Sequence, residues 1–128
     1  MELNIQLIKP GDFVKTTPAG ELDLNSSKEI LAGLAASSDA GQARPMLMDL
    51  RNTTSVLNTV DLFELGSSLL EYGMAYRRKT AVLTRNDDSF ERGSFFELVA
   101  RNRGYNVKAF TSFEEAIMWL AVIEDINL

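Results

Sequence analysis

The sequence predicts an α/β fold in which a mixed, mostly parallel five-stranded sheet is covered by about four helices. Short apolar runs typical of buried strands alternate with segments whose apolar residues recur at helical spacing. The turn signal Pro10-Gly11-Asp12 separates two early strand-like segments. Strands separated by helices favour parallel pairing through right-handed crossovers, so we expect the first strand to be the antiparallel exception.

The first seventeen residues are predicted to form that antiparallel pair. Residues 3–8 alternate apolar and polar side chains, which is the pattern of a half-buried strand, and residues 13–17 read as the second strand. Only a short turn joins them, as in a β-hairpin.

The rest of the chain alternates helices and buried strands. Four helix starts carry the spacing of a capping box, in which a polar residue is followed three positions later by an acidic one: Ser26 with Glu29, Asn58 with Asp61, Asp88 with Glu91, and Ser112 with Glu115. Three apolar runs read as buried strands, at residues 46–50, 80–84 and 107–110. Residues 52–55 are predicted to be a loop. On the last helix we expect Trp119 to be largely buried beside Phe110, Ala116 and Leu120.

Length and composition indicate one folded domain over residues 1–128. Hydrophobic residues make up 45% of the chain, which suits a buried core. The net charge of -5 argues against nucleic acid as a partner, because such proteins normally carry a basic surface.

The chain contains neither Cys nor His. The usual zinc sites, a Ser-His-Asp triad and a Cys-His pair are therefore excluded. We expect a protein that is not an enzyme and needs no cofactor or metal. A carboxylate-only magnesium site is the alternative, although acids at helix starts complement the helix dipole without a ligand. The acids in question are Asp23, Asp49, Asp61, Asp87 and Asp88.

The sequence predicts a cytoplasmic protein without a transmembrane segment. The N-terminus, Met1-Glu2-Leu3-Asn4, lacks the basic start and apolar stretch of a signal peptide. No apolar run is long enough to span a bilayer.

Three motifs follow one another along the chain. The first is Gly20-Glu21-Leu22-Asp23-Leu24 after the hairpin, and the second is the strand Met46-Leu47-Met48-Asp49-Leu50. The third is Val107-Lys108-Ala109-Phe110 followed by Ser112-Phe113-Glu114-Glu115-Ala116. In this order they resemble the STAS family, whose members include anti-sigma-factor antagonists. Residues 78–120 are most similar to the SpoIIAA-like branch. The resemblance implies a non-catalytic regulatory or protein-interaction domain with a protein partner, such as an anti-sigma factor or a kinase-like regulator.

The same resemblance implies a candidate binding or phosphoacceptor region. In STAS antagonists, a Ser that follows an Asp begins the second helix and is phosphorylated by a partner kinase. Asn58 and Thr59 stand at the matching positions here, without the Gly that follows in the family. With Asp23, Arg51 and Ser55 they should lie at the carboxyl edge of the sheet, where open α/β sheets place their sites. The simpler alternative is that Asn58 and Thr59 only cap a helix.

The sequence indicates two further candidate surfaces. Basic residues at strand starts and helix ends should gather at the opposite edge, where an acidic partner or only water would contact them: Arg44, Arg77, Arg78, Lys79, Arg101 and Arg103. Tyr72, Met74 and Tyr76 could form an exposed apolar patch. Gly66, Gly73 and Gly93 suggest close helix packing, either internal or across a homodimer.

The alternative function is a small-molecule or lipid-binding domain that uses a pocket between the helices and the sheet. A co-purified small molecule would favour it, whereas a defined protein partner would favour the regulatory domain.

Overall fold

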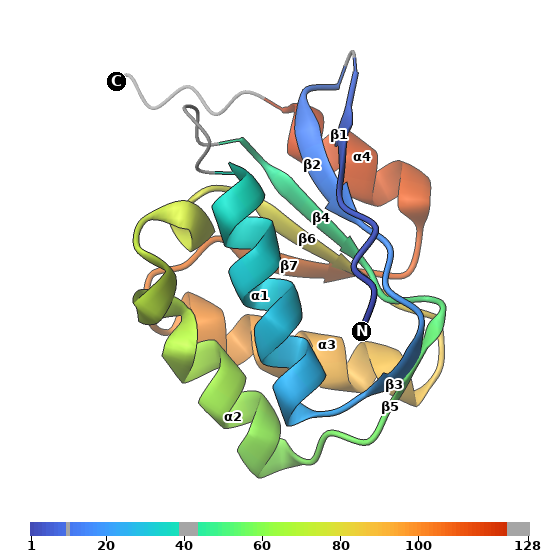
Figure 1. The fold of residues 1–128 in the computed structure, drawn as a ribbon, viewed down its shortest axis with the longest axis vertical. Coiled ribbons are helices and arrows are strands. Elements are labelled where there is room, and N and C mark those ends of the chain that lie inside the picture. The colour runs from blue at the N-terminus through green and yellow to red at the C-terminus, as the bar shows by residue number, and fades with distance from the viewer. Residues whose placement is uncertain (10, 39–43, 123–128) are drawn as a thin grey trace.

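The computed structural model describes residues 1–9, 11–38 and 44–122, and a five-stranded sheet lies at its centre (Figure 1). Its strands are β1 (Gln6–Ile8), β2 (Phe13–Thr16), β4 (Met46–Asp49), β6 (Thr80–Leu83) and β7 (Val107–Phe110). Their order across the sheet is β1-β2-β4-β6-β7. β1 is antiparallel to β2, and the other neighbours are parallel. The predicted mixed sheet with its N-terminal hairpin is confirmed.

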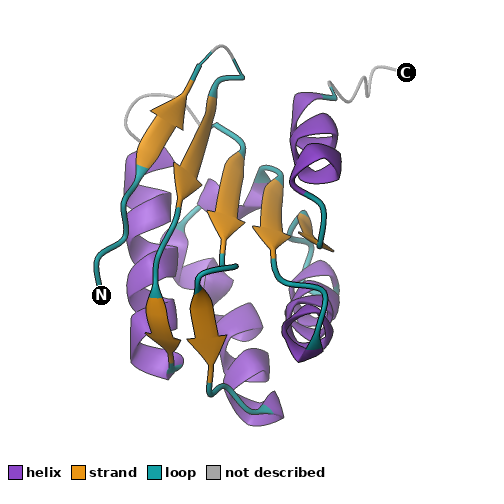
Figure 2. Cartoon of the chain, turned by 90° about the vertical axis from the view of Figure 1, so that its right-hand side faces the viewer, coloured by secondary structure: helices purple, strands orange, loops and turns teal. Residues whose placement is uncertain are grey.

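Helices cover both faces of this sheet. The helices are α1 (Leu24–Ser38), α2 (Thr59–Ser67), α3 (Asp88–Arg101) and α4 (Phe113–Ala121). α1, α2 and α3 pack on one face and α4 on the other (Figures 1 and 2). Within β4, Met46 and Met48 belong to the core under α1–α3, whereas Leu47 belongs to the core under α4. A strand buried on both faces reads as a continuous apolar run, which explains its sequence.

A second, two-stranded sheet corrects one prediction. Residues 52–55 were expected to be a loop, but β5 (Thr53–Ser55) pairs in parallel with β3 (Gly20–Leu22). The register places Leu22 opposite Ser55. This short ladder lies beyond the carboxyl end of β4 (Figure 2). A three-residue strand has too few positions to show a period, so its partner decides whether it forms.

The helix starts agree with the capping prediction at two of four positions. Asn58 caps α2 with a complete capping box to Asp61, and Ser112 caps α4 by accepting from the Glu115 amide. α1 begins three residues earlier than a cap at Ser26 would place it, because Asp23 precedes its first turn. α3 is capped by Asp87 rather than Asp88.

The segment after α2 consists of short helical turns. α2 ends at Ser67, and two 3₁₀ turns follow, Ser68–Tyr72 and Ala75–Arg77. Tyr76, predicted to lie in an exposed patch, is fully buried and donates its hydroxyl to the Leu31 carbonyl at 2.6 Å. Met74 is exposed as expected.

Gly66 lets α2 and α3 approach closely. A Cβ at this position would lie 2.5 Å from Cγ1 of Val99, which is too close for two carbon atoms. This close packing is internal to the domain.

Trp119 on α4 is half-buried, not largely buried as predicted. Its ring lies 5.6 Å from that of Phe110, centroid to centroid, while Ala116 and Leu120 are the buried residues of α4. A helix on the outside of a sheet buries one stripe only, and Trp119 lies at the border of that stripe.

Candidate functional site

The candidate site lies at the carboxyl edge of the sheet, where polar side chains from several segments lie close to one another. β4 and β6 end there, and α1, α2 and α3 begin on the same side (Figures 1 and 2). Open α/β sheets bind ligands at this edge because the loops and helix N-termini meet there.

The carboxylate of Asp49, the last residue of β4, is almost fully buried and is held by Arg51. Nε of Arg51 donates to Oδ1 of Asp49 at 2.9 Å, and a terminal guanidinium nitrogen donates to Oδ2 at 2.8 Å. Burial acts to raise the pKa of Asp49, but the hydrogen bonds from Arg51 outweigh it, so this pKa lies below its usual value. The same hydrogen bonds raise the pKa of Arg51.

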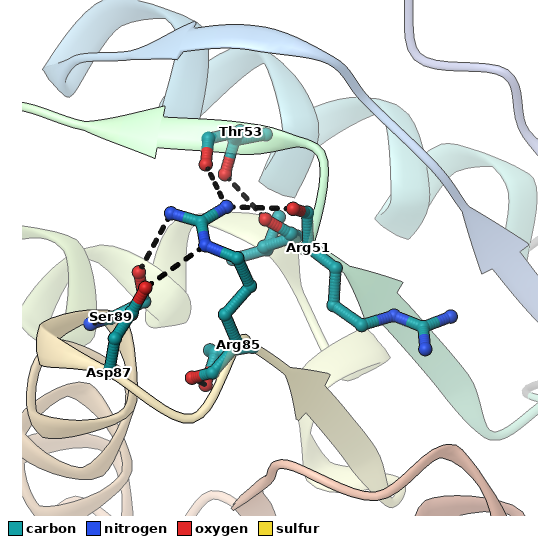
Figure 3. A network of polar contacts seen from close by, with 7 residues as sticks. Arg51, Thr53, Arg85, Asp87 and Ser89 are labelled. Carbon is teal, nitrogen blue, oxygen red and sulfur yellow. Dashed lines mark hydrogen bonds and ion pairs between the residues drawn. The ribbon is translucent and has the colours of Figure 1, made fainter.

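Arg85, just after β6, joins three segments at this edge (Figure 3). Its Nη1 donates to the carbonyl oxygens of Arg51 and Thr53, both at 2.7 Å. Its Nε contacts the Asp87 carboxylate at 3.1 Å, and its Nη2 lies 3.4 Å from the Ser89 hydroxyl. Arg85 therefore ties the turn after β4 and the strand β5 to the start of α3. Sequence reasoning missed this residue, although its place directly after a buried strand was the signal that could have found it.

Four of the five predicted site residues lie on adjoining segments, and Arg51 is directed elsewhere. Asp23 follows β3 and Ser55 ends the neighbouring β5, while Asn58 and Thr59 begin α2 shortly after. The Arg51 side chain turns away from the partners of Arg85 (Figure 3) and lies 5.7 Å over the Phe113 ring of α4.

Each of these residues has a structural role except Thr59. Asp23 Oδ1 accepts from the Ser26 amide at 2.8 Å, and these hydrogen bonds from Ser26 lower the pKa of Asp23. Ser55 Oγ accepts from the Leu57 amide, and Asn58 accepts from the Asp61 amide. The Thr59 side chain is exposed, and its hydroxyl forms no hydrogen bond within the described residues. The Thr59 hydroxyl is therefore not engaged in capping α2.

Four of the five aspartates of the alternative magnesium site have separate structural roles. Asp23, Asp61 and Asp87 serve the starts of three different helices, and Asp49 pairs with Arg51. Within residues 1–9, 11–38 and 44–122, no three acidic side chains are grouped closely enough to hold a metal ion.

The predicted basic edge is largely engaged in contacts within the domain. Arg44 pairs with Asp12, and Arg101 with Glu97. Lys79 donates to the carbonyl of Trp119, and Arg103 lies 4.9 Å over the ring of Phe63. These contacts satisfy the cations without an acidic partner.

A mostly apolar cavity of about 70 Å³ lies beneath the carboxyl edge, and we call it the edge cavity. It is lined by residues of the first two turns of α1 and the first three turns of α3, by Leu62 and Leu65 of α2, and by residues at the ends of β4 and β6. A second, outer hollow between α2 and α3 shares Leu62 and Arg92 with it. We call it the α2–α3 hollow, and its other residues are Thr59, Asp88, Glu91 and Phe95.

Comparison with solved structures identifies the fold. A crystal structure of an uncharacterized protein of the DUF3478 family from Shewanella loihica PV-4, described as having a SpoIIAA-like fold, superposes with a TM-score of 0.58. The match covers 93% of this chain and 92% of that one at 17% sequence identity. This chain has a SpoIIAA-like fold. The resemblance of the sequence to STAS domains of the SpoIIAA-like branch is thus confirmed at the level of the fold.

No protein-family model matches the sequence, and no curated protein matches it significantly. Among the described residues of this SpoIIAA-like domain, no helix has the length and apolar character needed to cross a bilayer.

Proposed function

We propose that this SpoIIAA-like domain is a non-catalytic regulatory module that binds a partner protein on the surface around the start of α2. This docking surface consists of Val56, Asn58, Thr59, Val60 and Phe63. The observation that carries the proposal is the exposure of two valines beside Thr59: Val60 is 73% exposed and Val56 is 54% exposed. Apolar side chains grouped on a polar surface are typical of protein interfaces.

The charge around the docking surface favours a partner with basic residues. Asp88 and Glu91 line the same hollow as Thr59, and both are exposed. Glu21 and Asp23 are also exposed on the adjoining β3 segment. We therefore expect a partner that places an apolar side chain against Val60 and a rim of Lys or Arg against the acids. The resemblance to STAS domains suggests an anti-sigma factor or a kinase-like regulator.

Site-specific crosslinking tests the proposal. A photo-crosslinking residue at position 60 should capture one protein from cells, and the same residue at position 118 should not. Met118 is a matched control because it is 68% exposed but belongs to α4, on the other face of the sheet. Val60→Asp should abolish binding of the captured protein, while Met118→Asp should leave it unchanged.

The identity of the captured protein shows what binds the docking surface. Capture of a second copy of this chain would indicate a homodimer in place of a different partner. Equal capture from positions 60 and 118, or full binding by Val60→Asp, would overturn the proposal.

A further inference from the structure

The edge cavity has an apolar interior, and no residue of the docking surface lines it. Buried side chains of α1, β4, β6 and α3 form much of its wall: Ile30, Leu31, Met48, Val82 and Phe96. An interior of this kind holds an apolar group readily and a hydrated ion poorly. The cavity therefore suits a ligand with an aliphatic part.

Ser27 places an unsatisfied hydroxyl in the wall of this cavity. Ser27 lies in the first turn of α1 and is only 7% exposed. Its Oγ has no hydrogen-bond partner within the described residues. The other hydroxyls of the cavity wall are all hydrogen-bonded: those of Thr53, Ser55, Thr84 and Ser89. A buried hydroxyl without a partner is costly, and a ligand oxygen in the cavity would satisfy it.

Arg92 supplies a cation at the boundary between the edge cavity and the α2–α3 hollow. It lines both, and its side chain is half-buried in the second turn of α3. In the described part of the chain its guanidinium makes no hydrogen bond, ion pair or ring contact. Asp88 and Glu91 line the same hollow without pairing with it. An arginine in this state can bind a carboxylate through two parallel hydrogen bonds.

We propose that the edge cavity binds a small aliphatic monocarboxylate, with its carboxylate at Arg92, its tail among the apolar side chains and an oxygen within reach of the Ser27 hydroxyl. This site is independent of the protein-binding proposal. Asp88 and Glu91 stand outside the cavity and repel a dianion, so they favour a carboxylate over a phosphate. It also gives specific form to the small-molecule function predicted as the alternative from sequence.

The volume of the cavity sets the length of the tail. Since about 10–15 Å³ is enough for one water molecule, a cavity of about 70 Å³ accommodates about five to seven groups of the size of a water or a methylene. Hexanoate fits this limit. The acyl chain of a membrane lipid is too long, so a short-chain acid rather than a lipid is the expected ligand.

The direct test is a titration of the full chain with hexanoate, in which binding is measured by the chemical shifts of backbone amides in NMR spectra. We expect saturable shifts at Ser27 and Gly93, which both line the cavity. Hexylamine has the same tail and the opposite charge, so it should not bind. Dodecanoate has the same head group and twice the tail, so it should bind more weakly than hexanoate.

Two variants assign the polar contacts. Arg92→Met should weaken hexanoate binding about tenfold or more, and Ser27→Ala about threefold to tenfold. Arg78→Met is the matched control for the arginine, because Arg78 is exposed and lines neither the edge cavity nor the α2–α3 hollow. Ser67→Ala is the control for the serine, since the Ser67 hydroxyl is also unsatisfied but lies outside the cavity.

A second readout separates a ligand-binding role for Ser27 from a structural one. Ser27→Ala should raise the melting temperature of the ligand-free protein, because it removes an unsatisfied hydroxyl while it weakens binding. The proposal is overturned if hexanoate causes no shifts at the cavity, if hexylamine binds equally well, or if both variants bind hexanoate as the parent does. Tighter binding of dodecanoate than of hexanoate would overturn the short-chain assignment.

Discussion

Arg51 forms a bidentate ion pair with the carboxylate of Asp49, two residues earlier in the chain. The Asp49 side chain is 5% exposed, whereas that of Arg51 is 42% exposed. The pair therefore closes the end of β4 with a buried carboxylate that is held by a guanidinium at the surface. Removal of Arg51 would leave this carboxylate buried without its charged donor.

Arg51→Met should destabilise the protein by about 1–3 kcal/mol at neutral pH, because it leaves a buried carboxylate without its charged donor. The pKa of Asp49 is lowered in the folded state, so its ionised form contributes stability above the usual value of 3.8, and this stability is lost as the pH falls through the lower folded value. The difference between parent and variant in urea unfolding should therefore shrink below pH 3.8. A difference that stays constant with pH would contradict this assignment.

Arg85→Met should loosen the small β3–β5 sheet more than the central sheet. Arg85 donates to the carbonyl of Thr53 in β5 and to that of Arg51 before it. Loss of these bonds should destabilise the fold by about 1.5–3 kcal/mol and increase amide exchange in β3 and β5. Hydrogen exchange followed by NMR measures the effect, with the exposed Arg78→Met as control. Uniformly increased exchange over all strands would argue against a local tie.

Thr59→Glu should fold as stably as Thr59→Ala. Thr59 is the first residue of α2, where a negative charge is favoured by the helix dipole. If phosphorylation regulates the docking surface, Thr59→Glu should no longer bind the partner identified by crosslinking, whereas Thr59→Ala should still bind it. The reason is that Glu supplies part of the negative charge that a phosphate would add. Thermal melting and a binding titration of both variants check this. Unchanged binding by both would leave a binding module without this switch.

Trp119→Ala should lower the free energy of unfolding by about 2–3 kcal/mol. This is less than for a fully buried tryptophan, because the ring is half-buried against Phe110. Lys79 also lies 5.2 Å over the indole ring. The fluorescence maximum of the single tryptophan should fall between those of a buried indole and of indole in water. Emission like free indole, together with an unchanged free energy of unfolding for the variant, would contradict the packing of α4.

Much of the fold is determined by local patterns in the sequence. The apolar runs at Met46–Asp49, Thr80–Leu83 and Val107–Phe110 are long enough to identify buried strands, and the alternation with helices makes them parallel. Asn58 and Ser112 identify their helix starts because the capping bonds join residues only three positions apart. The carboxyl edge as the place of the candidate site follows from the same alternation.

Only the tertiary structure decided which side chains act together at that edge. Thr53–Ser55 becomes a strand because Gly20–Leu22 lies beside it, and no local pattern specifies that pairing. Arg51 and Arg85 are both arginines after strands, yet one turns to Asp49 and the other to backbone carbonyls.

Within the described residues, the Ser27 hydroxyl and the Arg92 guanidinium have no polar partner, and this too was decided by the tertiary structure. Whether a polar group is buried, and whether it finds a partner among the described residues, depends on packing between segments far apart in the sequence. Local patterns therefore determined the elements of this protein and their order, whereas long-range packing decided the chemistry of its cavity.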